Sequence, residues 1–161
     1  LQAVREALDA AGLPGHRLEV EITESLLMGH DEQVLATLHG LVEMGVHVAM
    51  DDFGTGFSSL AYLWRYPFGK VKIDRAFTQR LPADAKVDLI VRSIVRLAHA
   101  LGMRVNAEGV ETDAQRLALI GHGCDELQGY LLGRPLPAEH LPHRAGGRAA
   151  APAREATATV A

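Results

Sequence analysis

The chain has 161 residues, of which 48% are hydrophobic and 22% charged, and its formal charge is −4. These values are typical of one globular domain with a buried core. They give no electrostatic basis for binding DNA, RNA or an anionic membrane, and no apolar run is long enough to span a bilayer. The single cysteine, Cys124, excludes an intrachain disulfide and indicates a reducing compartment, so we expect a cytoplasmic location.

Hydrophobic periodicity predicts helices and strands that alternate along the chain. In chain order, the expected elements are a helix over 1–11, a strand over 18–23, a helix over 31–44, a strand over 46–50, a short helix over 57–64, a strand over 71–73, a helix over 86–101, a strand over 104–107, a helix over 113–121 and a short strand around Leu127. Successive strands start roughly 22–33 residues apart, which is the length of a strand–helix–strand unit. The fold class is therefore α/β with a parallel sheet.

The composition changes near His143, after which alanine, arginine, glycine and threonine dominate without any hydrophobic pattern. We therefore predict a folded region over 1–142 and a disordered tail over 143–161. The sequence begins with Leu1 rather than methionine, and we expect it to be a piece of a longer polypeptide.

Chemically active side chains gather near the C-terminal ends of the predicted strands. They are Glu21 and Glu24, Asp51 and Asp52, Lys72 and Asp74, Glu108 and Glu111, and Gln128. The C-terminal ends of parallel strands converge on one face of a barrel, where enzymes of this architecture place their sites. Hard cations such as Mg²⁺ and Mn²⁺ prefer carboxylate oxygens, so the pattern predicts a metal and phosphate site.

Asp51 and Asp52 are adjacent, and on a continuing strand their side chains would point to opposite faces. If the chain turns there, as Gly54 and Gly56 permit, both carboxylates can converge on one or two metal ions. Taken alone, the pair is explained equally well as a cap of the following helix.

Lys72 alternates with two apolar neighbours, so its side chain faces away from them. In a barrel mouth such a lysine can orient an attacking water or neutralise phosphate charge, although an ordinary surface lysine would give the same pattern. Glu21 lies inside a strand, where it needs a cation or donor unless that edge is solvated. Four acid-bearing strand ends together suit two-metal hydrolysis of a phosphodiester.

Five motifs in order over about residues 1–140 resemble the EAL-domain family. They are EITES at 21–25, DDFGTGFSS at 51–59, KVKID at 70–74, AEGVE at 107–111 and QGYLLGRPLP at 128–137. The resemblance implies a TIM-like barrel and a bacterial phosphodiesterase that hydrolyses cyclic di-GMP to the linear dinucleotide with Mg²⁺ or Mn²⁺.

The resemblance also implies metal ligands. Glu21 matches a ligand of the first metal, Asp51 a residue that binds or bridges the metals, and Asp52 a ligand of the second. Glu108 matches a glutamate assigned to the second metal or to general-base catalysis.

Further roles follow from the same motifs. Lys72 matches the lysine that contacts the hydrolytic water, and Gln128 a glutamine that orders the site. Glu24 matches the glutamate that steadies the loop over 52–59, which is linked to metal binding and to a homodimer. Two further acids match motif positions without an assigned role, Asp74 and Glu111.

The family's Glu-Ala-Leu strand and the strand with its metal-binding asparagine have no counterpart in this sequence. The chain would hold five of the eight strands, so either it is part of a longer intact protein or its site is incomplete. We expect the intact domain to be a cyclic di-GMP phosphodiesterase and these 161 residues alone to be inactive. The alternative is a non-catalytic module that senses cyclic di-GMP or binds a protein.

Overall fold

A computed structural model describes residues 1–27, 31–54, 60–137 and 157–158, which form one parallel sheet with helices packed against it. The strands are β1 (Glu19–Thr23), β2 (His47–Phe53), β3 (Lys70–Ile73), β4 (Arg104–Ala107), β5 (Glu126–Leu127) and β6 (Thr157–Ala158). The helices are α1 (Gln2–Ala11), α2 (Asp31–Glu43), α3 (Leu60–Arg65), α4 (Arg75–Thr78), α5 (Ala85–Ala100) and α6 (Asp113–His122), with short 3₁₀ turns η1 (Gly15–Arg17) and η2 (Glu24–Leu27).

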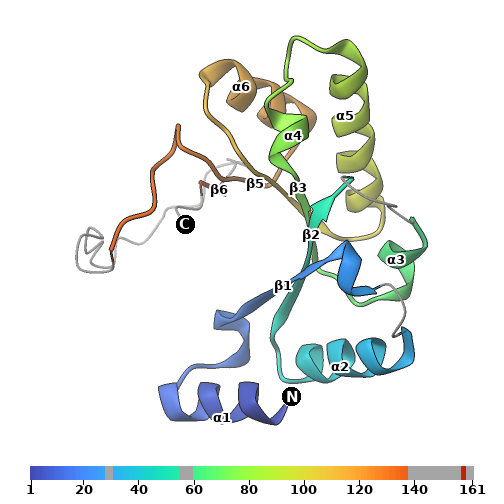
Figure 1. Ribbon diagram of the computed structural model, residues 1–161, viewed down its shortest axis with the longest axis vertical. Helices are drawn as coiled ribbons and strands as arrows, with labels where there is room; N and C mark the ends of the chain where they lie inside the picture. The colour runs from blue at the N-terminus through green and yellow to red at the C-terminus, as the bar shows by residue number, and fades with distance from the viewer. Residues whose placement is uncertain (28–30, 55–59, 138–156, 159–161) are drawn as a thin grey trace.

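The six strands pair in chain order, each parallel to the next. Figure 1 shows α2, α3 and α5 along one side of the sheet, as expected when each helix returns the chain to the start of the next parallel strand. β1 and β6 are the edges of the described sheet, so these strands form an open arc. The predicted fold class, part of a TIM-like barrel, is confirmed.

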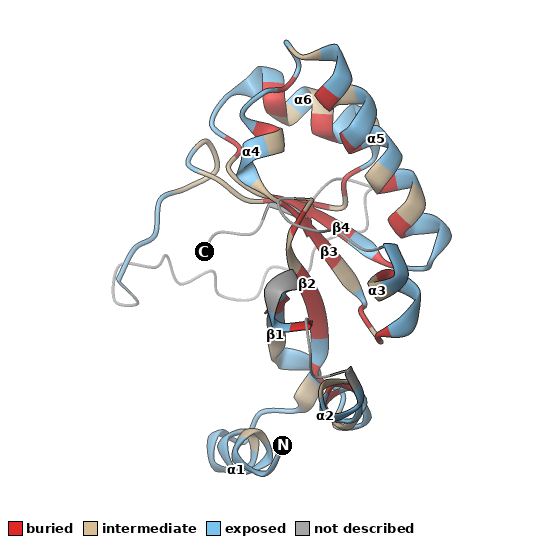
Figure 2. Ribbon diagram, turned by 45° about the vertical axis from the view of Figure 1, so that its right-hand side comes forward, coloured by how far each residue is buried: buried red, intermediate tan, exposed pale blue. Residues whose placement is uncertain are grey.

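The two faces of this sheet differ sharply in chemistry. Buried apolar residues occupy the face that packs against the helices, among them Val48, Met50, Val71, Ile73, Val105, Ala107 and Leu127. They join Val91, Val95 and Leu119 of α5 and α6 in the same core, and Figure 2 shows the buried positions running through the strands and helix faces. Because side chains alternate along a strand, the residues between them point to the opposite, concave face.

Local sequence signals explain where the longer helices begin. Thr112 Oγ1 accepts a hydrogen bond from Gln115 N–H, and Gln115 Oε1 accepts one from Thr112 N–H at 2.9 Å, so the two residues form a capping box at the start of α6. Asp84 caps α5 by accepting from the N–H groups of Lys86 and Val87. Cys124 is a buried free thiol whose pKa burial raises to about 12, which fits a small core residue.

The structure differs from the sequence prediction in three places. β2 continues to Phe53 instead of ending at Met50, with a register shift against β3 between these two residues. α4 was not predicted, because four residues are too few to show helical periodicity. Thr157–Ala158 pairs with β5 as β6, whereas the sequence predicted no regular structure there; the remaining tail lies outside the described residues.

Candidate functional site

Three carboxylates from different strands meet the ammonium group of Lys72. Lys72 Nζ lies 2.7 Å from Glu21 Oε2 of β1, 3.1 Å from Asp51 Oδ1 of β2, and 2.6 Å from Glu108 Oε1, which follows the end of β4. Lys72 is 4% exposed, so its charge depends on these partners rather than on water. We call Glu21, Asp51, Lys72 and Glu108 the carboxyl-edge cluster.

The strand register explains why these side chains converge. Lys72 lies on β3 between Val71 and Ile73, both of which are fully buried among the helices, so the lysine faces the concave side as predicted. The N–H of Glu108 donates to the carbonyl oxygen of Ile73 at 3.0 Å, which extends the β3–β4 pairing by one residue and holds Glu108 beside Lys72.

Lys72 is held in its charged form. Burial alone would lower its pKa, but hydrogen bonds to Glu108 and Glu21 and the charge of Glu108 raise it above its usual value. The group is therefore a fixed positive charge at neutral pH, suited to stabilising negative charge on a ligand.

The carboxyl-edge cluster carries excess negative charge, since three carboxylates face one ammonium group. Burial raises the pKa of Glu108; Lys72 opposes that shift, and the charges of Asp51 and Glu21 add to it. Asp51 Oδ1 is buried and lies 3.1 Å from Lys72 Nζ, so the ammonium group is its partner. The excess of carboxylates over ammonium groups favours binding a cation.

The donor set fits a hard divalent cation, because every available ligand is a carboxylate oxygen. Among the described residues, no group of three His, Cys, Asp or Glu side chains is arranged so that it could hold a metal ion. The carboxylates are instead drawn to Lys72 Nζ, so a bound ion would share Glu21, Asp51 and Glu108 with that ammonium group.

Asp52 lies within β2 near its carboxyl end, where the sequence predicted a turn after Met50. Its backbone is left-handed, with φ 54°, in the irregular stretch between Met50 and Phe53. Burial raises its pKa, and the neighbouring charges of Asp51 and Asp74 raise it further. The two aspartates therefore lie together at the carboxyl end of the sheet, as predicted, but Asp52 itself provides part of the turn.

The other predicted residues take different places. Gln128 follows β5, and its N–H donates to the carbonyl oxygen of Ala107 at 2.9 Å, which places it beside Glu108 across the β4–β5 pair. Asp74 caps α4 by accepting from Ala76 N–H at 2.8 Å. Glu111 contributes its N–H, which donates to Gln115 Oε1. The side chain of Glu24 and residues 55–59 of the proposed dimer loop lie outside the described structure.

Gly109 fixes the backbone directly after Glu108. Its φ is +68°, and a Cβ there would lie 2.4 Å from Arg75 Cβ. We expect Gly109→Ala to lower the free energy of unfolding by about 2 kcal/mol, combining left-handed strain with the steric clash, as measured by urea unfolding. Gly121→Ala is the matched control, since nothing lies within 4 Å of that helical position and alanine should stabilise α6. Equal effects at both positions would contradict this account.

A second charge cluster, which the sequence did not predict, lies on the concave face at the amino-terminal ends of the strands. Lys70 Nζ lies 2.7 Å from both Glu19 Oε2 and Glu126 Oε2, and Arg104 Nη1 lies 2.9 Å from Glu126 Oε1. We call these four residues the inner cluster. Two acids match two bases, so its charges balance, and hydrogen bonds to Glu126 and Glu19 raise the pKa of Lys70 against the effect of burial.

The signal for the inner cluster was present in the sequence. Glu19 precedes Glu21 by two residues, and Lys70 precedes Lys72 by two, so each pair shares one face of its strand. Asn106 belongs to the same face of β4 and lies in register with Lys72, yet it was also missed.

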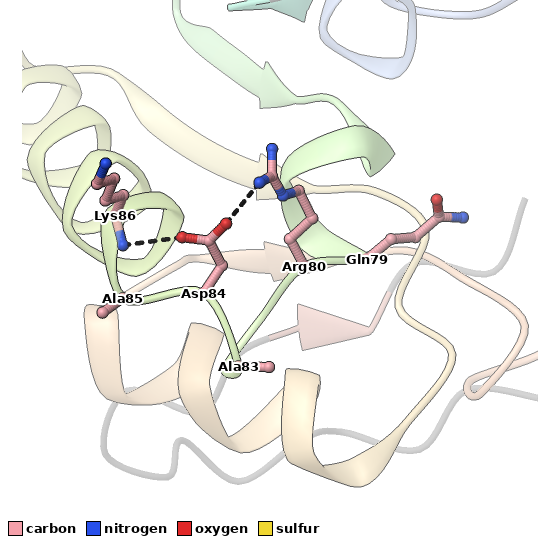
Figure 3. Close-up of a pocket in the computed structure, with 6 residues that line it drawn as sticks. All are labelled: Gln79, Arg80, Ala83, Asp84, Ala85 and Lys86. Atoms are coloured by element: carbon pink, nitrogen blue, oxygen red, sulfur yellow. Dashed lines mark hydrogen bonds and ion pairs between the residues drawn. The ribbon is translucent and has the colours of Figure 1, made fainter.

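A separate hollow of about 700 Å³ lies where α4 leads into α5. Its lining residues are Gln79, Arg80, Ala83, Asp84, Ala85 and Lys86 (Figure 3). Asp84 accepts hydrogen bonds from the start of α5 and pairs with Arg80, so its charge is already compensated. No residue of either charge cluster lines this hollow.

A parallel β/α sheet with carboxylates and a lysine at its carboxyl edge is typical of barrel proteins, which place their sites at this edge. The family model described as EAL domain matches residues 1–135. The chain belongs to the EAL domain family.

Similar proteins support this assignment. The chain is 47% identical over 141 residues to the bifunctional diguanylate cyclase/cyclic di-GMP phosphodiesterase MucR of Pseudomonas aeruginosa, covering 88% of this chain and 21% of that protein. The solved MucR phosphodiesterase–c-di-GMP complex matches with a TM-score of 0.80 at 47% identity, over 86% of this chain and 56% of that one. A manganese/cyclic di-GMP complex of Klebsiella pneumoniae BlrP1 matches with a TM-score of 0.79 at 34% identity, over 83% of this chain and 34% of that one.

The sequence therefore spans about half of the solved MucR phosphodiesterase chain and about a fifth of the MucR protein. None of the helices that the structure describes is long and apolar enough to cross a membrane.

Proposed function

We propose that the domain containing this chain hydrolyses cyclic di-GMP to the linear dinucleotide. The observation that carries the proposal is the carboxyl-edge cluster, in which Lys72 gathers acids from three strands of an EAL-type sheet. Its relatives support the substrate, since MucR, NbdA and RocR of Pseudomonas aeruginosa are named cyclic di-GMP phosphodiesterases.

The acids at the carboxyl edge are the proposed ligands of two divalent ions, Mg²⁺ or Mn²⁺: Glu21, Asp51, Asp52 and Glu108. Bound there, such ions would activate water and neutralise phosphate charge. The BlrP1 complexes with manganese or calcium support the choice of a divalent ion. The excess of three carboxylates over one ammonium group in the cluster supports it independently.

Water attacks one phosphorus in line with the leaving oxygen, one phosphodiester bond breaks, and the leaving oxygen takes up a proton. Glu108 is the candidate proton acceptor, because its carboxylate lies beside Lys72 at the carboxyl edge of the sheet. Lys72 is too firmly protonated for that role, and we assign it to orienting the water and stabilising charge on the phosphate. Gln128, beside Glu108, completes the site.

The remaining assignments concern the surroundings of the site. We propose that Glu24 steadies the loop over 52–59 and that a homodimer forms through this loop. A cytoplasmic location is supported by the buried free thiol of Cys124.

The proposal is tested by incubating the full-length protein with cyclic di-GMP and Mn²⁺ or Mg²⁺ and separating the products by chromatography. We expect linear dinucleotide, complete loss of turnover with a chelator, and recovery when the metal is restored. Tight binding of cyclic di-GMP without any linear product would instead support a non-catalytic sensing module.

The 161-residue chain by itself provides a second comparison. It covers 56% of the solved MucR phosphodiesterase chain, and we expect it to show no measurable hydrolysis under the same conditions. Turnover by this chain that disappears in Asp51→Ala would show that five strands are sufficient for catalysis.

A further inference from the structure

Asn106 is a buried polar residue between the two charge clusters. It lies on β4, is 4% exposed, and pairs in register with Lys72 of β3 and Glu126 of β5. Alternation places its side chain on the same concave face as Arg104 and Glu108, which precede and follow it by two residues. Asn106 therefore separates the carboxyl-edge cluster from the inner cluster.

The side-chain oxygen of Asn106 accepts no hydrogen bond from any residue that the structure describes. Leaving a buried amide oxygen without a hydrogen bond is unfavourable, so such atoms usually have a water or ligand partner. Lys72, the cation in register with Asn106, cannot be the missing hydrogen-bond donor, because its three N–H groups face three carboxylates.

A water molecule meets the requirement, since the surroundings are polar and a buried water commonly makes about three hydrogen bonds. Such a water can donate one proton to Asn106 Oδ1 and the other to a nearby carboxylate. Glu126 is already engaged through both oxygens, by Lys70 and Arg104. Glu108 is engaged by Lys72 through Oε1, so its second oxygen can accept.

The spacing along β4 suits this bridge. Residues two apart on a strand are separated by about 6.6 Å, a distance that one water between two side chains can span. We propose that Asn106 is a positioning residue, which binds an internal water and through it orients the carboxylate of Glu108. The water bridge between Asn106 and Glu108 does not depend on the proposed function. The inference rests on that function only for the chemistry that Glu108 carries out.

The expected consequence is on metal affinity, because hydrogen bonds that orient a ligand typically change affinity by about 10–100-fold. Asn106→Leu keeps the branched shape of the side chain and removes the acceptor. We expect the Mn²⁺ dissociation constant of the full-length protein, measured by electron paramagnetic resonance titration, to rise about 10–100-fold. Asn106→Ser restores an acceptor, and its affinity should return to within a few-fold of the native value.

Thr78→Val is the matched control. Thr78 also has a fully buried side-chain oxygen without a hydrogen-bond partner among the described residues, but it lies on α4 in the core. Its isosteric replacement should leave Mn²⁺ affinity unchanged. If Asn106→Leu also leaves affinity unchanged, or if Asn106→Ser weakens it as much as leucine does, the proposal is wrong.

A crystal structure of the unaltered protein gives a test that needs no variant. Electron density for a water bridging Asn106 Oδ1 and Glu108 supports the proposal, and direct contact of Asn106 with a protein group in place of water overturns it. Both readouts are independent of hydrolysis. A protein that holds this water but leaves cyclic di-GMP intact would disprove the proposed function while leaving the role of Asn106 standing.

Discussion

Replacing Lys72 with methionine is expected to reduce turnover of cyclic di-GMP by about 100-fold or more, the usual size of one positioned catalytic group. The same change should lower the free energy of unfolding of the metal-free protein by about 3 kcal/mol. The reason is that Lys72 Nζ is the shared cation of Glu21, Asp51 and Glu108, which would be left close together without it. Glu21 is nearly half exposed, so water can solvate its charge when Lys72 is removed. The loss of unfolding free energy is therefore at the lower end of the range for breaking a buried ion pair.

The pH dependence of this loss has a definite sign. The pKa of Lys72 is raised in the folded state above its ordinary 10.5, so its contribution is fully present below about pH 10.5 and is lost as the pH rises through the folded value. The difference in unfolding free energy between the native protein and Lys72→Met should therefore be constant from neutral pH to about pH 10 and shrink above it. Chemical unfolding over a series of pH values measures this difference.

Lys86→Met is the control for removing a lysine. Lys86 is exposed in the first turn of α5, and only its backbone N–H is needed to bind the capping Asp84. We expect a change of less than about 0.5 kcal/mol and unchanged turnover. A Lys72→Met protein as stable and as active as this control would mean that the carboxyl-edge cluster has no role in folding or catalysis.

Asp52→Asn is expected to separate stability from activity. Asp52 has its pKa raised by burial and by Asp51, so its ionised form destabilises the metal-free fold at every pH above its ordinary 3.8. Asparagine removes that charge and tolerates the left-handed backbone at φ 54°. The metal-free protein should gain about 0.5 kcal/mol at neutral pH, the size of a partly solvated charge interaction.

Turnover should move in the other direction. Asp52 is a proposed ligand of the second metal, and we expect Asp52→Asn to lose about 100-fold in turnover together with Mn²⁺ affinity. Thermal unfolding with and without Mn²⁺, combined with the hydrolysis assay, measures both effects. Asp113→Asn neutralises an exposed acid on α6 and should produce neither. A destabilised Asp52→Asn protein would show that repulsion from Asp51 is not the dominant force on this residue.

Hydrophobic periodicity was sufficient to predict most of this fold. The β4 bounds 104–107 match the structure, and the capping box at Thr112 fixed the start of α6. Such signals are local, so a single sequence records them. The run to Phe53 in β2 and the register shift beside Asp52 depend on pairing with β3, which lies about twenty residues further along the chain.

Only part of the candidate site could be predicted from the sequence, again because some of its contacts depend on how the strands pair. Lys72 and Glu108 stand out because each is a charged residue near the C-terminal end of a predicted strand. Asn106 and the inner cluster were missed, although period-two alternation places them on the concave face with Lys72. Their importance depends on which residues face them across the sheet, and that information comes only from the register.

Apolar packing lies on the helix-covered face of the sheet, while both charge clusters occupy the concave face. Adaptation can therefore act on one face without rebuilding the other: chemistry is set by a few polar substitutions, and the fold is set by the branched aliphatic residues behind them. A related protein that lost Asp52 or Glu108 could keep the same fold, because neither residue belongs to the apolar core. Such a protein could bind a ligand without hydrolysing it and use that binding for regulation.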